Sequence, residues 1–153
     1  MGGRVPRGPR PRAADRTRVA ALANVRRLRP DLSEAEAVAS ARYQLELEYV
    51  DVADIAAAPG AHELLGELDR LGLPWAVVTS ADPPLARTRL AAAGIRPALL
   101  VTIDDVRAGK PDPEGYLLAA RKLGADPRRC LVVEDAEAGV RAGQAAGAVV
   151  AAL

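Results

Sequence analysis

The chain has few of the residues on which several classes of protein depend. Phenylalanine is absent, and the aromatic residues are limited to Tyr43, Tyr49, Trp75 and Tyr116. Because single strands of nucleic acid are bound largely by stacking bases on aromatic rings, this composition argues against that activity. The only cysteine, Cys130, excludes a disulfide framework and a cysteine-based zinc site. A single thiol fits a reducing compartment, so we expect a cytoplasmic protein.

Long apolar segments are missing as well. No apolar run approaches the roughly 20 residues that a helix needs to cross a bilayer, and the N-terminal region has no apolar stretch of the kind found in secretory signals. We therefore expect no membrane partner. The chain has 153 residues, of which 50% are hydrophobic and 27% are charged. This composition is typical of one globular domain with a small appendage, and its core must be built from Ala, Leu and Val.

Charge is distributed unevenly along the chain. The net charge is +1, but residues 1–30 contain nine arginines and one aspartate, a net of +8, and the remainder has a net of −7. Residues 1–12 are rich in Gly, Pro and Arg and are expected to form a disordered basic tail. Charge alone specifies no partner, so a solvated tail is the first interpretation and a nucleic-acid-binding module is the alternative. Salt-sensitive binding that disappears on deletion of residues 1–12 would identify the second.

Residues 13–58 predict a helical hairpin with no strand before it. Apolar residues recur every three positions between Ala13 and Leu28, which suits one face of a helix, and Pro30 ends that pattern. Ser33 and Glu36 form the S-x-x-E pattern of a capping box and begin a second helix that runs to about Val50. The spacing predicts a buried face on each helix, made of Val19, Leu22, Val25 and Leu28 on the first and of Val38, Ala41, Leu45 and Tyr49 on the second.

Residues 59–153 alternate between helix and strand patterns. Amphipathic helical segments separate four apolar runs of strand length, at Trp75–Thr79, Ala98–Thr102, Cys130–Val133 and Ala148–Ala152. Continuous apolar runs of this kind indicate a parallel sheet that helices cover on both faces. The fold class predicted is therefore α/β, a doubly wound, Rossmann-like parallel sheet of about four strands, preceded by the helical segment.

Polar residues follow three of the predicted strands. Thr79 and Ser80 end the first, Lys110 lies in a loop after the second, and Glu134 and Asp135 follow the third. Ligands of open parallel sheets bind at the carboxyl ends of the strands, where these residues are expected to meet. Thr79 and Ser80 also have a structural interpretation as turn hydroxyls, and Glu134 and Asp135 as an acidic pair at a helix N-terminus. Lys110 is one of only two lysines among 21 basic residues, which indicates a position that needs a compact ammonium group. Adjacent carboxylates repel each other unless a cation lies between them, and hard oxygen ligands suit Mg²⁺, so we predict a magnesium site.

Two other classes of α/β protein fit less well. A phosphoacceptor receiver domain has its acidic pair early in the chain, whereas here the pair comes last. A dinucleotide-binding domain needs a G-x-G-x-x-G turn between strand and helix, and the glycines near the C-terminus lie within or after a helix instead.

The segments WAVVTS, GKPDPEGY and LVVEDAEAG occur in that order. They resemble the second, third and fourth motifs of the haloacid dehalogenase-like (HAD) superfamily of phosphohydrolases. The resemblance covers roughly Pro59 to Leu153, the α/β core. Residues 13–58 resemble, more weakly, the later part of a helical cap. The subgroup with such a cap includes sugar-phosphate and polyol-phosphate phosphatases, so the resemblance implies hydrolysis of a small phosphorylated metabolite with Mg²⁺ as cofactor.

The resemblance also implies roles for individual residues. Thr79 and the backbone N–H of Ser80 would bind the transferring phosphoryl group. Lys110 would neutralise the charge of the phosphate and of the attacking carboxylate. Asp135 would coordinate Mg²⁺, and Glu134 would assist directly or through water. The sequence indicates neither which phosphate ester is bound nor the oligomeric state.

The family's first motif has no counterpart in this chain. That motif is an apolar strand followed by D-x-D, whose first aspartate attacks phosphorus and whose second acts as general acid and base. The sequence contains no D-x-D. In the family fold the strand of this motif lies in the middle of the sheet, so the resemblance implies that the usual central first strand is lacking and that the strands predicted at Trp75–Thr79 and Cys130–Val133 have no shared partner. Two explanations stay open: an N-terminally incomplete product of a longer gene, or a protein that has lost catalysis and kept a phosphate- or metal-binding shell. Under either, we expect no meaningful phosphatase activity from this polypeptide, and no residue here is assigned as the nucleophile.

Overall fold

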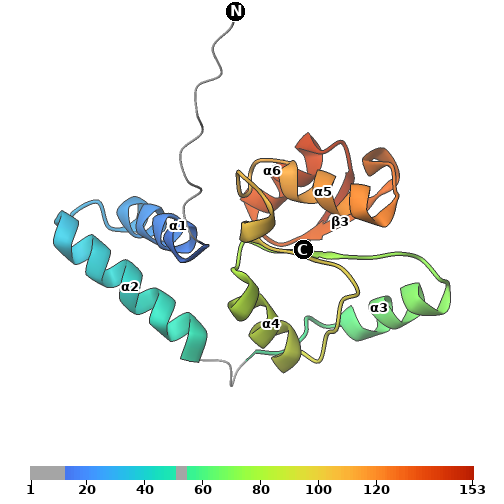
Figure 1. Ribbon diagram of the computed structural model, residues 1–153, viewed down its shortest axis with the longest axis horizontal. Helices are drawn as coiled ribbons and strands as arrows, with labels where there is room; N and C mark the ends of the chain where they lie inside the picture. Colours follow the sequence, from blue (N-terminus) through green and yellow to red (C-terminus); the bar gives the residue numbers. More distant parts are fainter. Residues whose placement is uncertain (1–12, 51–54) are drawn as a thin grey trace, which may run out of the picture.

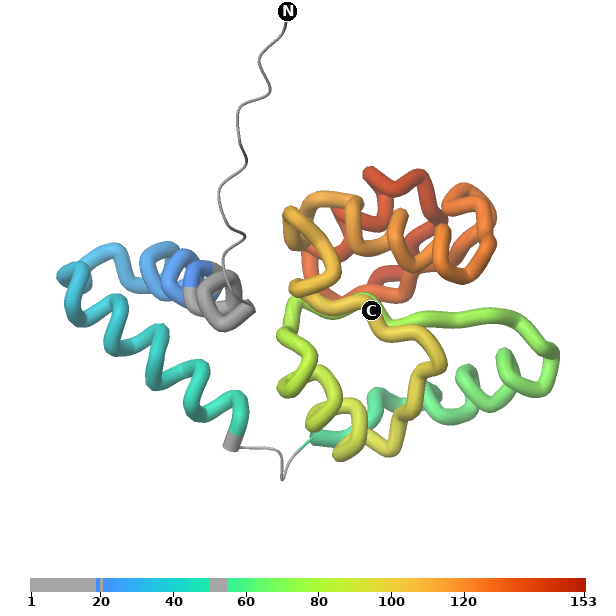
Figure 2. The backbone as a smooth tube through the Cα atoms, in the orientation of Figure 1, coloured from blue at the N-terminus to red at the C-terminus, as the bar shows by residue number. Residues whose placement is uncertain are grey.

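The computed structural model describes residues 13–50 and 55–153. The basic tail of residues 1–12 lies outside the described residues, so its expected disorder stays a prediction. Figure 1 and Figure 2 show a pair of helices beside an α/β part in which short strands alternate with helices. The helices are α1 (Ala13–Leu28), α2 (Glu34–Val50), α3 (Ala61–Arg70), α4 (Pro83–Ala92), α5 (Glu114–Leu123) and α6 (Glu137–Ala145). The strands are β1 (Val77–Val78), β2 (Leu100–Val101), β3 (Leu131–Glu134) and β4 (Val149–Ala152), and two short 3₁₀ helices are η1 (Ile103–Asp105) and η2 (Pro127–Arg129).

Helices α1 and α2 form the expected hairpin, and the capping box is confirmed. The backbone N–H of Ser33 donates to the Glu36 carboxylate at 2.9 Å, and the N–H of Glu36 donates to the Ser33 hydroxyl at 3.4 Å. These bonds satisfy donors that the first turn of α2 would leave unpaired.

The predicted buried faces of the hairpin are partly wrong. Val19, Leu28, Val38 and Tyr49 are exposed, and the buried cluster consists of Ala21, Val25, Ala37 and Ala41. Leu22 and Leu45 pack against this cluster and are partly buried. Two helices that pack mainly against each other bury only a narrow stripe, and small alanine side chains let them approach closely.

The hairpin contacts the α/β part through α1, which lies next to η1, and through two polar contacts of α2. The Tyr49 hydroxyl of α2 donates to Oδ2 of the buried Asp82, and Arg89 of α4 lies 3.7 Å from the Glu48 carboxylate. Asp82 is also the N-cap of α4, where its Oδ1 accepts from the N–H of Leu85 at 3.0 Å. Two prolines in the first turn of α4 supply the fixed backbone angle that a helix start favours.

The α/β class is confirmed, with the strands arranged in two pairs. In the first pair, β1 and β2 are parallel, with Val77 opposite Leu100, and in the second, β3 and β4 are parallel, with Leu131 opposite Val149. The expected sheet of about four strands is thus divided, because no strand in the described part of the chain pairs with both β1 and β3.

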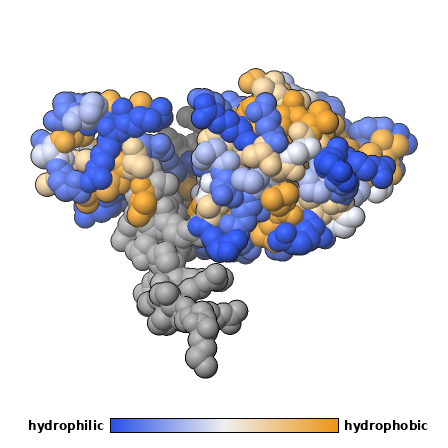
Figure 3. Space-filling model, turned by 90° about the horizontal axis from the view of Figure 1, so that it is seen from above, coloured by the Kyte–Doolittle hydropathy of each residue, from blue (hydrophilic) through white to orange (hydrophobic). Residues whose placement is uncertain are grey.

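Helices cover the two strand pairs unequally. Helix α5 packs against β1 and β2, and α6 packs against β3 and β4. Val132 and Glu134 of β3 are buried on the α6 side, whereas Leu131, Val133 and Val149 are exposed on the other. The prediction of a sheet covered on both faces is therefore wrong for β3 and β4, since among the described helices α6 makes the main contact with this pair. Figure 3 shows hydrophobic patches among hydrophilic residues on the face that it presents. Of the helices described, none combines the length and apolar character that a membrane span requires.

Candidate functional site

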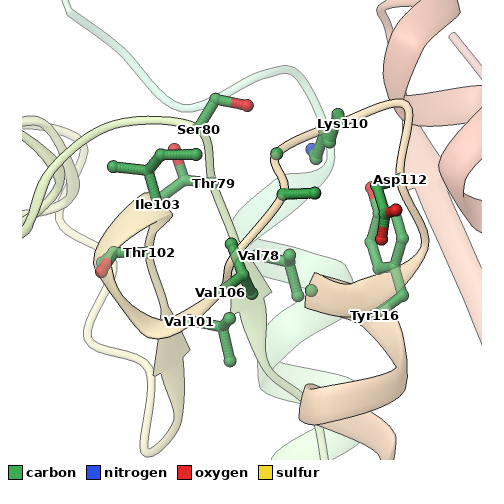
Figure 4. A pocket seen from close by; sticks show the side chains of 13 residues that line it. Val78, Thr79, Ser80, Val101, Thr102, Ile103, Val106, Lys110, Asp112 and Tyr116 are labelled. Atoms are coloured by element: carbon green, nitrogen blue, oxygen red, sulfur yellow. The ribbon is translucent and has the colours of Figure 1, made fainter. Parts of the chain in front are cut away.

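The carboxyl ends of β1 and β2 open onto a small cavity. Thr79 and Ser80, which follow β1, line it together with Thr102, which follows β2, and with Lys110 and Tyr116 (Figure 4). Parallel strands bring their carboxyl ends to the same edge, which is why residues from distant segments meet here. The Thr79 hydroxyl accepts a hydrogen bond from the N–H of Ala81 at 3.1 Å, so the turn after β1 is held by the threonine itself.

The loop between β2 and α5 carries Lys110 and is held at both ends. At its start, the Asp105 carboxylate accepts from the N–H and hydroxyl of Thr102 at 2.8 and 2.9 Å. At its end, the Glu114 carboxylate accepts from the N–H groups of Arg107 and Ala108 at 2.9 and 3.2 Å. The Lys110–Pro111 peptide bond is cis. These anchors place the lysine at the cavity edge.

Lys110 forms an ion pair with the last residue of β3. Its ammonium contacts Oε1 of Glu134, and 17% of the lysine side chain and 8% of the glutamate side chain are exposed. The Tyr116 hydroxyl donates to the same oxygen, and Nζ of Lys110 lies 5.2 Å from the centre of the Tyr116 ring. On the other side of the carboxyl group is Gly139 of α6, where a Cβ would overlap the Glu134 carboxyl. The β2–α5 loop, α5 and α6 thus all approach one carboxylate of β3.

The surroundings fix the charge states of this cluster. Burial alone would raise the pKa of Glu134, but hydrogen bonds from Lys110 and Tyr116 and the lysine charge outweigh it, so that pKa lies below its ordinary value. Burial raises the pKa of Tyr116, and its hydrogen bond to the Glu134 carboxylate raises it further. At neutral pH, Glu134 is therefore an anion and Tyr116 a neutral phenol that donates a hydrogen bond.

The structure brings most of the predicted site residues together. Thr79, Ser80 and Lys110 line one cavity, and Glu134 contacts Lys110 from behind it. Asp135 follows β3 and is exposed. No cluster of three or more metal-ligating side chains occurs in the parts of the chain that are described. The donors nevertheless fit Mg²⁺ in type, since this ion is often held by one or two carboxylates, with water and substrate phosphate completing its shell.

Sequence reasoning missed Tyr116 as a site residue. Its place in the apolar pattern of α5 indicated only a packing role. The signal that could have found it is its position in the first turn of α5, near the amino end of a helix that packs on β1 and β2. In a doubly wound fold, the amino ends of helices that follow strands lie near the ligand-binding edge of the sheet.

These features describe an α/β protein in which hydroxyl groups and a lysine line a cavity at the carboxyl ends of two parallel strands. A family model of haloacid dehalogenase-like hydrolases matches residues 7–147. The chain therefore belongs to the haloacid dehalogenase-like hydrolases.

Several known proteins are similar to this chain over most of its length. Hexitol phosphatase A from Escherichia coli is 43% identical over 134 residues, which cover 87% of this chain and 62% of the relative. The 2-deoxyglucose-6-phosphate phosphatase 1 of Saccharomyces cerevisiae is 34% identical over 144 residues, 82% of this chain and 58% of the relative. A crystal structure of a hydrolase from Pseudomonas syringae superposes with a TM-score of 0.68 at 33% identity, covering 88% of this chain and 62% of that one. The chain thus spans about six-tenths of the length of these relatives.

Proposed function

We propose that this chain carries the phosphate-binding part of a magnesium-dependent phosphatase for small phosphate monoesters. The observation that carries the proposal is that Thr79, Ser80 and Lys110 line one cavity at the carboxyl ends of two parallel strands. A phosphate group needs hydrogen-bond donors and a compensating positive charge, and a hydroxyl, a backbone N–H and an ammonium group supply both.

Each residue has a distinct task in this proposal. The hydroxyl of Thr79 and the N–H of Ser80 orient the phosphoryl oxygens. The Lys110 ammonium, held by the loop before α5, offsets the charge that develops on those oxygens during transfer. Asp135 would hold Mg²⁺, and Glu134 would assist through water, because its Oε1 already accepts from Lys110 and Tyr116 and its side chain does not line the cavity. The ion would supply further neutralisation of phosphate charge.

The substrate class follows from the relatives rather than from the cavity. The relatives are named for phosphates of a hexitol and of 2-deoxyglucose. We infer that the ligand of this chain is a sugar phosphate or polyol phosphate, and that it meets the enzyme in the cytoplasm, which the single reduced cysteine favours.

We propose that turnover needs an aspartate nucleophile, which the three matched motifs do not contain. Phosphoryl transfer in this family begins with attack by an aspartate of D-x-D, and the sequence has no such pattern. The proposal is therefore that this polypeptide binds phosphate without hydrolysing esters at a meaningful rate. A steady release of phosphate from small phosphate esters that Lys110→Ala abolishes would contradict this part.

Calorimetric titration with inorganic phosphate, with and without Mg²⁺, tests the binding site. Lys110→Ala should weaken phosphate binding by about tenfold or more, because it removes a charge-assisted hydrogen bond. Lys122→Ala is the matched control, since Lys122 is the only other lysine and its closest acidic contact is Asp105 at 4.0 Å, outside the cavity. Equal loss in both variants, or no phosphate binding by the parent chain at millimolar concentrations, would refute the site.

A further inference from the structure

We propose that Tyr116 is a positioning residue that keeps the Glu134 carboxylate out of the cavity and the Lys110 ammonium directed into it. The inference rests on the proposed phosphate site and assigns a role to a residue that is not one of the predicted site residues. Its basis is that Lys110 and Tyr116 both donate to one oxygen atom of Glu134.

The contacts show which side of the cluster faces the cavity. Lys110 and Tyr116 line the cavity, whereas Glu134 is not among the lining residues. Both of the lining side chains donate to Oε1 of Glu134. Two donors converging on one oxygen restrict rotation of the carboxyl group, and the close approach of Gly139 restricts it from the α6 side. The carboxylate is thereby fixed behind the lysine.

The second donor also changes how strongly Lys110 is neutralised. A hydrogen bond from the Tyr116 hydroxyl stabilises part of the negative charge on Oε1, so the ammonium is held less tightly by that oxygen. The face of the Tyr116 ring, 5.2 Å from Nζ, adds a weak attraction that keeps the ammonium at the cavity edge. Without the hydroxyl, Glu134 either binds the ammonium more fully or turns toward the cavity. Both changes disfavour a bound anion.

Tyr116→Phe tests this role because it removes the hydroxyl and keeps the ring. We expect inorganic phosphate to bind about three- to tenfold more weakly, the effect of one hydrogen bond. Tyr116→Leu, which also removes the ring, should bind phosphate at least as weakly. Tyr43→Phe is the matched control, since it removes the same group from a residue of α2 that is 63% exposed.

Lysine side-chain NMR provides a readout that does not depend on phosphate. The chain has two lysines, so isotope-labelled lysine gives two Nζ signals, and Lys122→Arg assigns them. In Tyr116→Phe the Lys110 signal should shift while the Lys122 signal stays in place. In Tyr43→Phe neither should move.

The outcomes separate this inference from the proposed function. Weaker phosphate binding together with a shifted Lys110 signal supports the role of Tyr116. Unchanged phosphate affinity in Tyr116→Phe overturns it, provided that the parent chain binds phosphate. If the parent chain binds none, the proposed function fails, and the NMR signal alone decides: a shifted Lys110 signal supports the positioning of the ammonium by Tyr116, and an unmoved one refutes it.

Discussion

The ion pair between Lys110 and Glu134 should be measurable as a coupling energy. Removing one member of a buried ion pair commonly costs about 3–5 kcal/mol, because the remaining charge loses its partner. Here 17% of the lysine side chain stays exposed, and a glutamine at position 134 would still accept from Tyr116. We therefore expect Glu134→Gln to lower the free energy of unfolding by about 1–3 kcal/mol, the cost of leaving a buried polar group unsatisfied.

A double-mutant cycle isolates the pair from other effects. Lys110→Met should be destabilising on its own because it leaves the buried carboxylate unpaired, while the double variant with Glu134→Gln should be less destabilised than the two single variants added together. The free energy of unfolding of each variant should be measured by urea denaturation, and the slope of that free energy against urea concentration should be the same in all variants. A coupling energy below about 0.5 kcal/mol would refute the reasoning, since neighbours in one hydrogen-bonded network couple by more than this.

Acid provides an independent check on the same pair. Because the pKa of Glu134 in the folded chain lies below its ordinary value of 4.5, the carboxylate contributes stability above that pH and loses it as the pH falls through the folded value. The stability difference between the parent chain and Glu134→Gln should therefore shrink on acidification.

Two further predictions concern glycine-to-alanine substitutions in α6 and α3 and the ionisation of Tyr49. Gly139→Ala should destabilise the fold by about 1–3 kcal/mol in thermal or urea unfolding, because its Cβ would overlap the Glu134 carboxyl. Gly66→Ala, in an exposed part of α3 with nothing within 4 Å of the added carbon, should instead stabilise by about 0.5–1 kcal/mol; the same sign for both would contradict the packing argument. Burial and a hydrogen bond to Asp82 raise the pKa of Tyr49 to about 12. The neutral Tyr49 hydroxyl therefore stabilises the fold below pH 10, and this stabilisation is lost as the pH rises toward 12. In a spectrophotometric titration, the difference in tyrosinate absorbance between the parent chain and Tyr49→Phe should have its midpoint near pH 12.

Local signals predicted the helices well. The bounds of α1 match the predicted residues, and the capping box at Ser33 is formed as expected. These features depend on residues within one turn of each other, so a single segment carries the information. The strands also lie within the apolar runs, apart from Glu134, which extends β3 by one residue.

Features that depend on distant segments could not be predicted in the same way. An apolar run does not state which strand it pairs with, so the division of the strands into two pairs was indicated only by the family resemblance, whose central strand has no counterpart in this sequence. The buried residues between α1 and α2 are mostly alanines, because helix packing is favoured by close approach as well as by apolar side chains. Tyr116 donates to a carboxylate 18 positions away, a contact that only the tertiary structure creates. The predicted metal-binding roles of Asp135 and Glu134 stay predictions.

Asp82 serves two parts of the molecule with its two carboxylate oxygens. One oxygen begins α4, and the other accepts from the hairpin through Tyr49. Detachment of the hairpin would therefore remove a hydrogen-bond donor from Asp82, the N-cap of α4, which lies two positions after Ser80. Unfolding of the hairpin and of α4 should therefore be coupled through the contact between Tyr49 and Asp82. Hydrogen exchange of the backbone amides in the first turn of α4 should then report whether α1 and α2 are docked.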